Sequence, residues 1–580
     1  MQLLVPLILV SLLPGAPRGF ADVTTARVRQ PVALVARHGQ LLVANRRGGS
    51  ISVIDIASRD VVRELPLGGS PADIALLGES TVLVVDEQSN QLIRLESRPN
   101  ELPVRQRLAV AAKPVSVVVA PDCSLCSVAS LWARQLTVFD VGLDAALENP
   151  TTITLPFAPR MQWIRADSRR LVVADAFGGN LAVIDLASLR IQSLVRLEGH
   201  NIRGLATTQA GDELLISHQL LNAQVPTERP RVFWGAVLGN VVRGVSFDEL
   251  FRHAPTTGAP VEYELAHWSL HPLGRPGSAA GDPGDVAITT AGRGIVCLSG
   301  VDEIALRSTP RQPFERLGVG RRPVAVAFDE LEREAFVANQ FDDSISVVNL
   351  KPLQVTHTIS LGPIGPLSDE DRGEALFYDA RLSLDGWYSC HSCHTDGHSN
   401  GLLNDNFGDG SFGAPKRVLS LLGVNDTRPW SWNGSLSDLS TQIHKSIAIT
   451  MQGEKQATPE NVRLLYAYLA TLQPPPGIAA ARGTIDAAAV ARGKELFTNR
   501  DCASCHAGPQ WTSTETFDVG LTDEHQQTQF NPPSLLGVSQ RARWLHDNRA
   551  ASLPEAIRMH TAQTWKEQEL RDLAAFLESL

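Results

Sequence analysis

One strand-and-turn pattern of about forty residues recurs between residues 31 and 361. Each copy has a proline-led apolar strand, a polar turn, a small-residue strand, a hairpin of Asn, Asp or Gly, and alternating apolar residues that end in an acid. Short strands at this period are typical of a β-propeller, in which each four-stranded blade buries its faces only against its neighbours. The plainest copies are VANRRGGSISVIDI from Val43, VADAFGGNLAVIDL from Val173 and VANQFDDSISVVNL from Val337, and weaker copies start near Val84, Val128, Ile216 and Cys297. The seven starts predict about seven blades.

The interval between the fifth and sixth starts is nearly twice the others. We expect an irregular insertion there, at about residues 220–283, which lies on one face as a docking loop or serves no binding role. The repeats resemble the YVTN family of propellers, through the V-A-N…S-I-S-V-I-D phrase and the lead-ins Gly69-Ser-Pro71 and Gly320-Arg-Arg-Pro323. This resemblance implies a fold and says little of function.

The strand pattern stops after residue 362, and helical segments follow: DEDRGEALF, ENVRLLYAYLATL, AAAVARGKELF and QELRDLAAFLESL. Three prolines at 474–476 divide this helical region in two. The predicted fold is therefore multidomain, with an all-β propeller at residues 22–362 and two mainly α-helical halves at 363–474 and 477–580.

Each helical half carries one Cys-x-x-Cys-His motif. Two cysteines at this spacing form thioether bonds to a c-type haem, and the histidine after them becomes the proximal iron ligand. We assign haem 1 to Cys390, Cys393 and His394, and haem 2 to Cys502, Cys505 and His506, so that the expected cofactors are two covalently bound haems. A zinc site or a disulfide is the alternative for each pair.

The other three cysteines lie in the propeller. Cys123 and Cys126 have the same spacing, but Ser127 stands where the histidine would be, and we expect a local disulfide between them. Cys297 lies in an apolar strand and is expected to be a buried thiol.

The two helical halves behave as a duplication. The segment RGEALF from Arg372 matches RGKELF from Arg492, and SLLGVNDTRPWSWNGSLSDLSTQIHKS from Ser420 aligns without a gap to SLLGVSQRARWLHDNRAASLPEAIRMH from Ser534. In this register Trp432 pairs with His546 and Ser446 pairs with His560.

Each half should place the position of Ser446 or His560 on the distal side of its own haem. We therefore predict that His506 and His560 both bind the iron of haem 2, with Met559 as the fallback, and that Ser446 leaves the sixth position of haem 1 open. An ordinary surface histidine is the alternative for His560. His444, two residues before Ser446, should face elsewhere.

Together these residues resemble the bacterial dihaem cytochrome c peroxidase and MauG superfamily, over residues 363–580. The phrase LFYDARLSLDGWYSCHSCH and the motif Trp432-Asn433-Gly434 carry the resemblance. It implies that Trp432 lies between the haems and relays electrons, with a packing role as the alternative. It also implies catalytic roles for Gln442 and for the residue ten positions further on, which is Gln452.

This chain departs from the family at several positions. Gln452 replaces a distal carboxylate, and an amide can donate a hydrogen bond but cannot act as a general acid; Glu454 is a possible substitute. Asp409 stands where family peroxidases carry a switchable distal histidine, and the nearest histidine is His398. Arg417 and Arg541 lie near the expected calcium ligands, which argues against an interhaem calcium ion. At haem 2 the family uses Met or Tyr, so His560 would lower the haem potential.

Residues 1–21 resemble a secretory signal peptide, with an apolar run from Leu3 to Leu13 and small residues up to Ala21. The alternative is an uncleaved anchor. This segment predicts a periplasmic protein, and no later stretch is apolar enough to span a membrane. The net charge of −10 and the absence of a basic run argue against a nucleic-acid partner.

These features predict an exported dihaem oxidoreductase that reduces hydrogen peroxide, or oxygen, at haem 1. Its electron donor would be a small redox protein or a protein substrate, and the electrons would pass through haem 2. The alternatives are an electron-transfer or sensing module with both haems six-coordinate, and a propeller-led binding protein in which the haems only report redox state.

Overall fold

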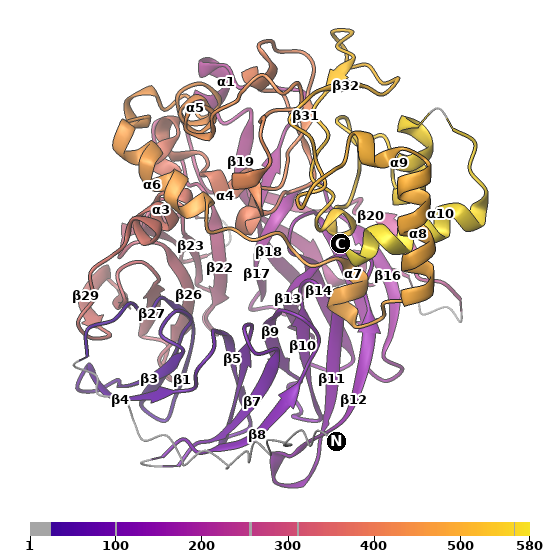
Figure 1. Cartoon of the computed structure of the whole chain (residues 1–580). Helices are drawn as coiled ribbons and strands as arrows, with labels where there is room; N and C mark the ends of the chain where they lie inside the picture. Colours follow the sequence, from indigo (N-terminus) through magenta and orange to yellow (C-terminus); the bar gives the residue numbers. More distant parts are fainter. Residues whose placement is uncertain (1–24, 99–100, 254–257, 310–311, 562) are drawn as a thin grey trace, which may run out of the picture.

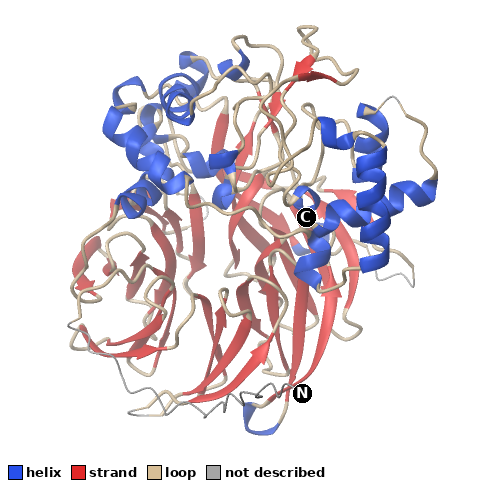
Figure 2. Ribbon diagram, in the orientation of Figure 1, coloured by secondary structure: helices blue, strands red, loops and turns tan. Residues whose placement is uncertain are grey.

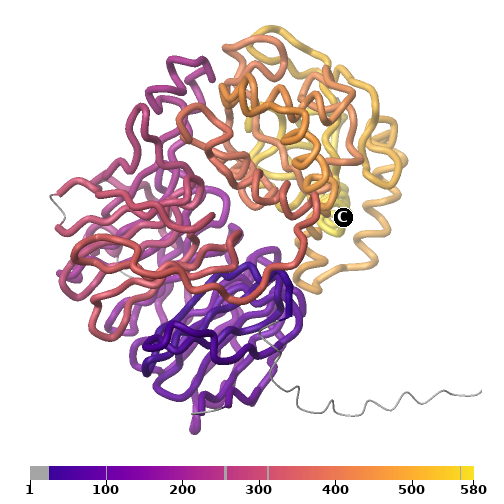
Figure 3. Tube along the Cα trace, turned by 90° about the vertical axis from the view of Figure 1, so that its left-hand side faces the viewer, coloured from indigo at the N-terminus to yellow at the C-terminus, as the bar shows by residue number. Residues whose placement is uncertain are grey.

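The computed structural model describes residues 25–98, 101–253, 258–309, 312–561 and 563–580. A ring of β-sheets fills one end of the molecule and a helical region covers the other (Figures 1 and 2). The two halves of the helical region, orange and yellow in Figure 3, lie together against one side of the ring. The expected signal peptide, residues 1–21, lies outside the described residues.

The ring consists of seven sheets whose strands follow one another in sequence, which confirms the predicted seven-bladed propeller. Blades one to four are β1 (Pro31–Arg37), β2 (Gln40–Asn45), β3 (Ser50–Asp55) and β4 (Asp60–Pro66); β5 (Pro71–Leu77), β6 (Thr81–Asp86), β7 (Gln91–Glu96) and β8 (Val104–Ala109); β9 (Pro114–Val119), β10 (Leu125–Ser130), β11 (Gln135–Val141) and β12 (Leu147–Thr154); and β13 (Pro159–Ile164), β14 (Arg170–Asp175), β15 (Asn180–Asp185) and β16 (Arg190–Arg196). Blades five to seven are β17 (His200–Thr207), β18 (Glu213–Leu221), β19 (Leu238–Ser246) and β21 (Ser269–Pro272); β22 (Pro283–Ile288), β23 (Gly294–Leu298), β24 (Glu303–Arg307) and β25 (Glu315–Gly318); and β26 (Pro323–Phe328), β27 (Glu334–Asn339), β28 (Ser344–Leu350) and β29 (Leu353–Ser360).

The first strand of each blade faces the propeller axis. Each first strand contacts the first strands of the two neighbouring blades, and β1 contacts β26, which closes the ring. Proline opens six of these seven strands. It is tolerated because the first residue of a strand can forgo a ladder hydrogen bond.

Apolar side chains between neighbouring blades form the propeller core. Leu42 and Ile51 of the first blade pack with Val82 and Ile93 of the second, and all four are almost fully buried. The outermost strands, such as β8, alternate between exposed and half-buried residues. The forty-residue period of the sequence therefore arises because the apolar side chains of each blade are buried against the next blade.

The segment expected as an irregular insertion contains regular structure. Strands β19 and β21 are the third and fourth strands of blade five, and β20 (Val261–Glu264) adds a parallel strand to blade four. The turns between these strands also contain the short helices α1 (Arg229–Phe233) and α2 (Phe247–Leu250). The forty-residue repeat could not be recognised in this part of the sequence because long turns separate its strands.

The propeller cysteines are thiols. Cys123 occupies a turn and Cys126 lies buried in β10, and no disulfide joins them, in contrast to the expectation. The strand directs the Cys126 side chain into the core between blades two and three, where burial raises the pKa of its thiol to about 12. Cys297 is a fully buried thiol in β23, as predicted.

The four helical segments named from the sequence form α3 (Asp369–Phe377), α6 (Pro459–Leu469), α8 (Ala487–Asn499) and α10 (Glu567–Ser579). The region also contains α4 (Cys390–Cys393), α5 (Leu439–Lys445), α7 (Ile478–Arg482) and α9 (Leu553–His560). Short antiparallel pairs join β30 (Leu403–Asn404) to β31 (Lys416–Arg417) and β32 (Phe517–Asp518) to β33 (Gln529–Phe530).

Both halves contain the same crossing of two helices. In the first half Gly373 of α3 lies against the Leu464 carbonyl of α6, and in the second Gly493 of α8 lies against the Asp572 carbonyl of α10. A β-carbon on either glycine would be 2.0 Å from that oxygen. The helices can approach this closely only because each crossing residue is glycine.

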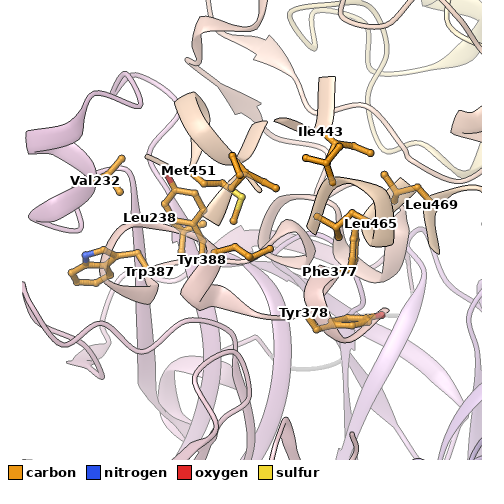
Figure 4. Close-up of a cluster of buried hydrophobic side chains, with 14 of the residues drawn as sticks. Val232, Leu238, Phe377, Tyr378, Trp387, Tyr388, Ile443, Met451, Leu465 and Leu469 are labelled. Carbon is orange, nitrogen blue, oxygen red and sulfur yellow. The ribbon is translucent and has the colours of Figure 1, made fainter. Parts of the chain in front are cut away.

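The first half shares a hydrophobic core with the propeller. Val232 and Leu238 from blade five pack with Trp387, Tyr388 and other side chains of the helical region (Figure 4). The indole Nε1 of Trp387 donates a hydrogen bond to the Phe233 carbonyl at 3.1 Å. The long turn around α1 is thus a docking loop within the chain itself.

Candidate haem sites

The first Cys-x-x-Cys-His motif opens onto a large cavity in the first helical half. Its empty volume is about 1930 Å³, including the opening to solvent. Cys390, Cys393 and His394 all line it. Burial raises the pKa of both thiols to about 12. The wall is mostly apolar, as expected for a site that holds a porphyrin.

His394 is oriented to bind a metal. Its Nδ1 lies 2.8 Å from the Leu419 carbonyl and must donate this hydrogen bond, because a carbonyl only accepts. The other ring nitrogen, Nε2, therefore carries the lone pair. Burial lowers the pKa of His394 to about 4, which keeps the ring neutral at pH 7 and able to act as a ligand.

The second motif has two histidines close together. His506 Nδ1 donates to the Trp511 carbonyl at 3.2 Å, and His560 Nδ1 donates to the Ala556 carbonyl at 2.5 Å, so both Nε2 atoms are available. Burial, together with the nearby His560 imidazole, lowers the pKa of His506 to about 4. Met559, the fallback ligand, points outward and is 39% exposed. Helix α9 thus turns His560, and not Met559, toward the second site.

The corresponding distal position of the first half carries Ser446, which lines the haem 1 cavity. It begins the π-helix η7 (Ser446–Thr450) that continues α5, a local distortion often found at functional sites. Gln442 lies one turn earlier and donates through Nε2 to the Ser446 hydroxyl at 3.1 Å. Its Oε1 is buried and has no hydrogen-bond partner among the described residues. His444 is exposed, as expected.

Gln452 lies outside the haem 1 cavity. It follows the π-helix with a φ of 55°, and its amide donates to the Thr227 and Ile449 carbonyls. This geometry joins the helical region to the propeller loop and places Gln452 apart from Gln442 and the other residues that line the cavity. Glu454 is exposed and does not line the cavity.

Asp409 is the only carboxylate among the residues that line this cavity. It ends the short helix η5 (Phe407–Asp409), which packs against the π-helix that carries Ser446. Its Oδ2 forms an ion pair with Lys416 at 3.2 Å, and its buried Oδ1 has no partner in the described part of the chain. From the sequence alone, Asp409 was expected only to mark the loss of a distal histidine.

His398 belongs to the contact with the propeller. Its ring packs against Phe177 and Trp132, Nδ1 bonds the Ser420 hydroxyl at 2.9 Å, and Nε2 bonds the Gln540 carbonyl at 3.4 Å. With both ring nitrogens engaged, His398 is held as an interface residue and not as a mobile distal ligand.

Trp432 joins the two halves. Its buried indole donates to the Arg417 carbonyl at 2.8 Å and packs against His546, its counterpart in the duplication, with ring centroids 6.2 Å apart. The backbone repeats this pairing: Arg417 N donates to His546 O at 2.6 Å, and Asn531 N donates to Trp432 O at 2.8 Å. Arg417 and Asn531 are also counterparts in the alignment, so the halves are related by a local pseudo-twofold.

Two arginines also face this region: Arg417 is buried and Arg541 is half-buried. Arg417 and Arg541 line the cavity, and neither has an ion-pair partner among the described residues. Burial lowers the pKa of both, to about 10 for Arg541, and their mutual repulsion lowers that of Arg417 further. Buried, unpaired guanidinium groups are costly unless they meet an anion, and the propionates of a bound haem would supply one. This observation fits the proposed cofactor.

The haem 1 cavity has one further iron donor that the sequence analysis missed. Met451 lies directly after the π-helix, lines the cavity and is 4% exposed. A thioether is a known axial haem ligand. Nothing in the spacing of the motifs distinguishes this methionine from a core residue.

The described residues hold no cluster of three or more His, Cys, Asp or Glu side chains that could bind a metal ion without a porphyrin. None of the helices in the same part of the chain is both long and apolar enough to cross a membrane.

Comparisons with known proteins agree with this geometry. Residues 369–481 match the family model of the di-haem cytochrome c peroxidases, and residues 490–580 match that of cytochrome c. The methylamine utilization protein MauG of Methylorubrum extorquens is 26% identical, over 36% of this chain and 76% of its own length. The cytochrome c551 peroxidase of Nitrosomonas europaea is 21% identical, over 36% of this chain and 78% of its own length.

Among solved structures, hydrazine synthase of Kuenenia stuttgartiensis matches with a TM-score of 0.48 and 18% identity, over 57% of this chain and 99% of that one. The predicted architecture is confirmed: a seven-bladed propeller precedes a region similar to di-haem peroxidases and MauG.

Proposed function

We propose that this chain is an exported dihaem oxidoreductase that reduces hydrogen peroxide at haem 1 with electrons supplied through haem 2. The reaction consumes one hydrogen peroxide, two electrons and two protons and yields two waters. One observation carries the proposal: the equivalent distal positions hold His560 in the second half and Ser446 in the first. The haems, when bound, supply the redox chemistry, and the protein supplies binding, orientation and electrostatics.

The residues around haem 1 suit a small hydroxylic substrate. Ser446 would be a poor ligand for an iron held by His394, so this side of the cavity would stay open to substrate. The two unpartnered oxygens in the cavity, Gln442 Oε1 and Asp409 Oδ1, can each accept a hydrogen bond from such a substrate. As the one carboxylate in the cavity wall, Asp409 can also move a proton, which is the role that Gln452 cannot fill.

Electrons would reach this cavity from the second half. We assign that path to Trp432, because its ring packs against both halves and is buried from water. The donor is proposed to be a small redox protein or a side chain of a protein substrate. The proposal places the chain in the periplasm, on the strength of residues 1–21 and of the haem-binding motifs.

Optical and electron spin resonance spectra of the ferric protein test the proposal. An open haem 1 and a bis-histidine haem 2 predict one high-spin and one low-spin centre per chain, and peroxide should consume the high-spin signal. Two low-spin centres that ignore peroxide would refute it and favour an electron-transfer module. If Met451→Leu then converts one of them to high spin, Met451 is the ligand that closes haem 1.

A further inference from the structure

A buried carboxylate of the propeller accepts hydrogen bonds from the segment of α4 that carries the haem 1 cysteines. Asp282 directly precedes β22 and is 3% exposed. Its two oxygens accept hydrogen bonds from the hydroxyls of Ser389 and Ser392, the latter at 2.5 Å. Ser389 caps α4, and Ser392 stands between the two haem-binding cysteines.

Two more propeller residues hold the same serine. His200 Nε2 donates to the Ser392 carbonyl at 2.9 Å, and Gln219 donates to the Ser392 hydroxyl at 3.1 Å. All three propeller side chains are buried and come from blades five and six. The haem 1 attachment helix is therefore fixed by a network that lies outside its own half.

The second motif lacks this support. Ser504 matches Ser392 in the motif, but it is exposed and its hydroxyl donates to the Asp501 carbonyl of its own turn. Within the described part of the chain, the serine of the first motif is therefore hydrogen-bonded to a buried carboxylate, whereas the serine of the second motif is hydrogen-bonded to a backbone carbonyl of its own turn.

A buried carboxylate close to a haem changes the reduction potential of that haem. Charges interact strongly where water is excluded, and ferric iron carries one more positive charge than ferrous iron. A fixed anion therefore favours the ferric form and lowers the reduction potential. The charge of Asp282 already acts at the cysteine sulfurs, where it adds to burial in raising the pKa of Cys390 and Cys393. Burial raises the pKa of Asp282 itself, and the hydrogen bonds from the Ser389 and Ser392 hydroxyls oppose that rise.

We propose that Asp282 of the propeller is a positioning residue for haem 1, which holds its attachment helix and lowers its reduction potential. The inference rests on the proposed attachment of haem at Cys390 and Cys393. It gives the propeller a part in the redox site.

The test is a spectroelectrochemical titration of the full-length holoprotein and of Asp282→Asn. The variant keeps the side-chain shape and removes the charge. At a fixed potential the ferrous-to-ferric ratio of haem 1 should rise about tenfold, which is about 59 mV for a one-electron couple. The ratio of haem 2 should not change. The matched control is Asp285→Asn, a half-buried propeller carboxylate that accepts hydrogen bonds from the backbone amides of Val286 and Val326.

The outcomes are distinct. An unchanged haem 1 ratio in Asp282→Asn, or an equal shift in Asp285→Asn, overturns the inference. Asp282→Ser removes the same charge with a smaller side chain and should give the same shift if the first variant does not fold. The mass of the intact protein, measured first, counts the covalent haems, so that a chain with no haem refutes the proposed function instead.

Discussion

Replacement of His560 by alanine tests the asymmetry between the two haems. The change removes the imidazole and its hydrogen bond to the Ala556 carbonyl. A hydrogen bond of this kind contributes about 1 kcal/mol to stability, which is too little to unfold a helix packed through Leu553 and Ile557. The spectroscopic effect should be complete, because the only low-spin centre predicted for the chain loses its sixth ligand.

Spin resonance of the ferric holoprotein measures this effect. The variant should show two high-spin haems and no low-spin signal, at unchanged haem content. Met559→Ala is the matched control, because Met559 directly precedes His560 on α9 but its side chain is exposed to solvent. This variant should leave the spectrum unchanged and alter the free energy of unfolding by less than about 0.5 kcal/mol. A low-spin signal that persists in His560→Ala, or is lost in Met559→Ala, would refute the ligand assignment.

Four further predictions follow from the contacts of single residues. Asp409→Asn should slow peroxide reduction at least about 100-fold, as the loss of a general acid-base group does, whereas Gln452→Ala should change the steady-state rate little. Trp432→Phe should slow electron transfer between the haems in stopped-flow mixing with peroxide, and an unchanged rate would reduce the residue to packing. Gly493→Ala should lower the free energy of unfolding of the second half by about 2 kcal/mol in chemical denaturation. A β-carbon there would meet a backbone oxygen, so the overpacking cost should lie near the upper end of its range, about 3 kcal/mol, and alanine returns about 1 kcal/mol of helix propensity. Burial lowers the pKa of His398 to about 3, so below about pH 6.5 the unfolded chain binds a proton there that the folded chain does not. This one group lowers stability by about 1.4 kcal/mol for each pH unit between about 6.5 and 4, and His398→Leu should reduce the slope of stability against pH by that amount in unfolding curves.

Local patterns explain which parts of the fold could be predicted. The strands around Val43, Val173 and Val337 and the helix at residues 369–377 were visible because each has its own periodicity and turn residues. Blade five was misjudged because long turns separate β18, β19 and β21, and the pairing of distant strands leaves no local signal. The disulfide expected between Cys123 and Cys126 failed for a related reason, since strand pairing directs Cys126 into the core.

The proposed haem-binding residues could largely be identified from the sequence. The two motifs fix which cysteines and histidines can attach a porphyrin, and the gapless duplication singles out His560 and Ser446, because equivalent positions in a repeated fold take equivalent places. The surroundings of haem 1 were decided only by the tertiary structure. The paths of two loops place Asp409 in the wall of the cavity and Gln452 outside it. Asp282 lies more than a hundred residues before the cysteines that it supports, and only the packing of the propeller against the helical region brings its charge there.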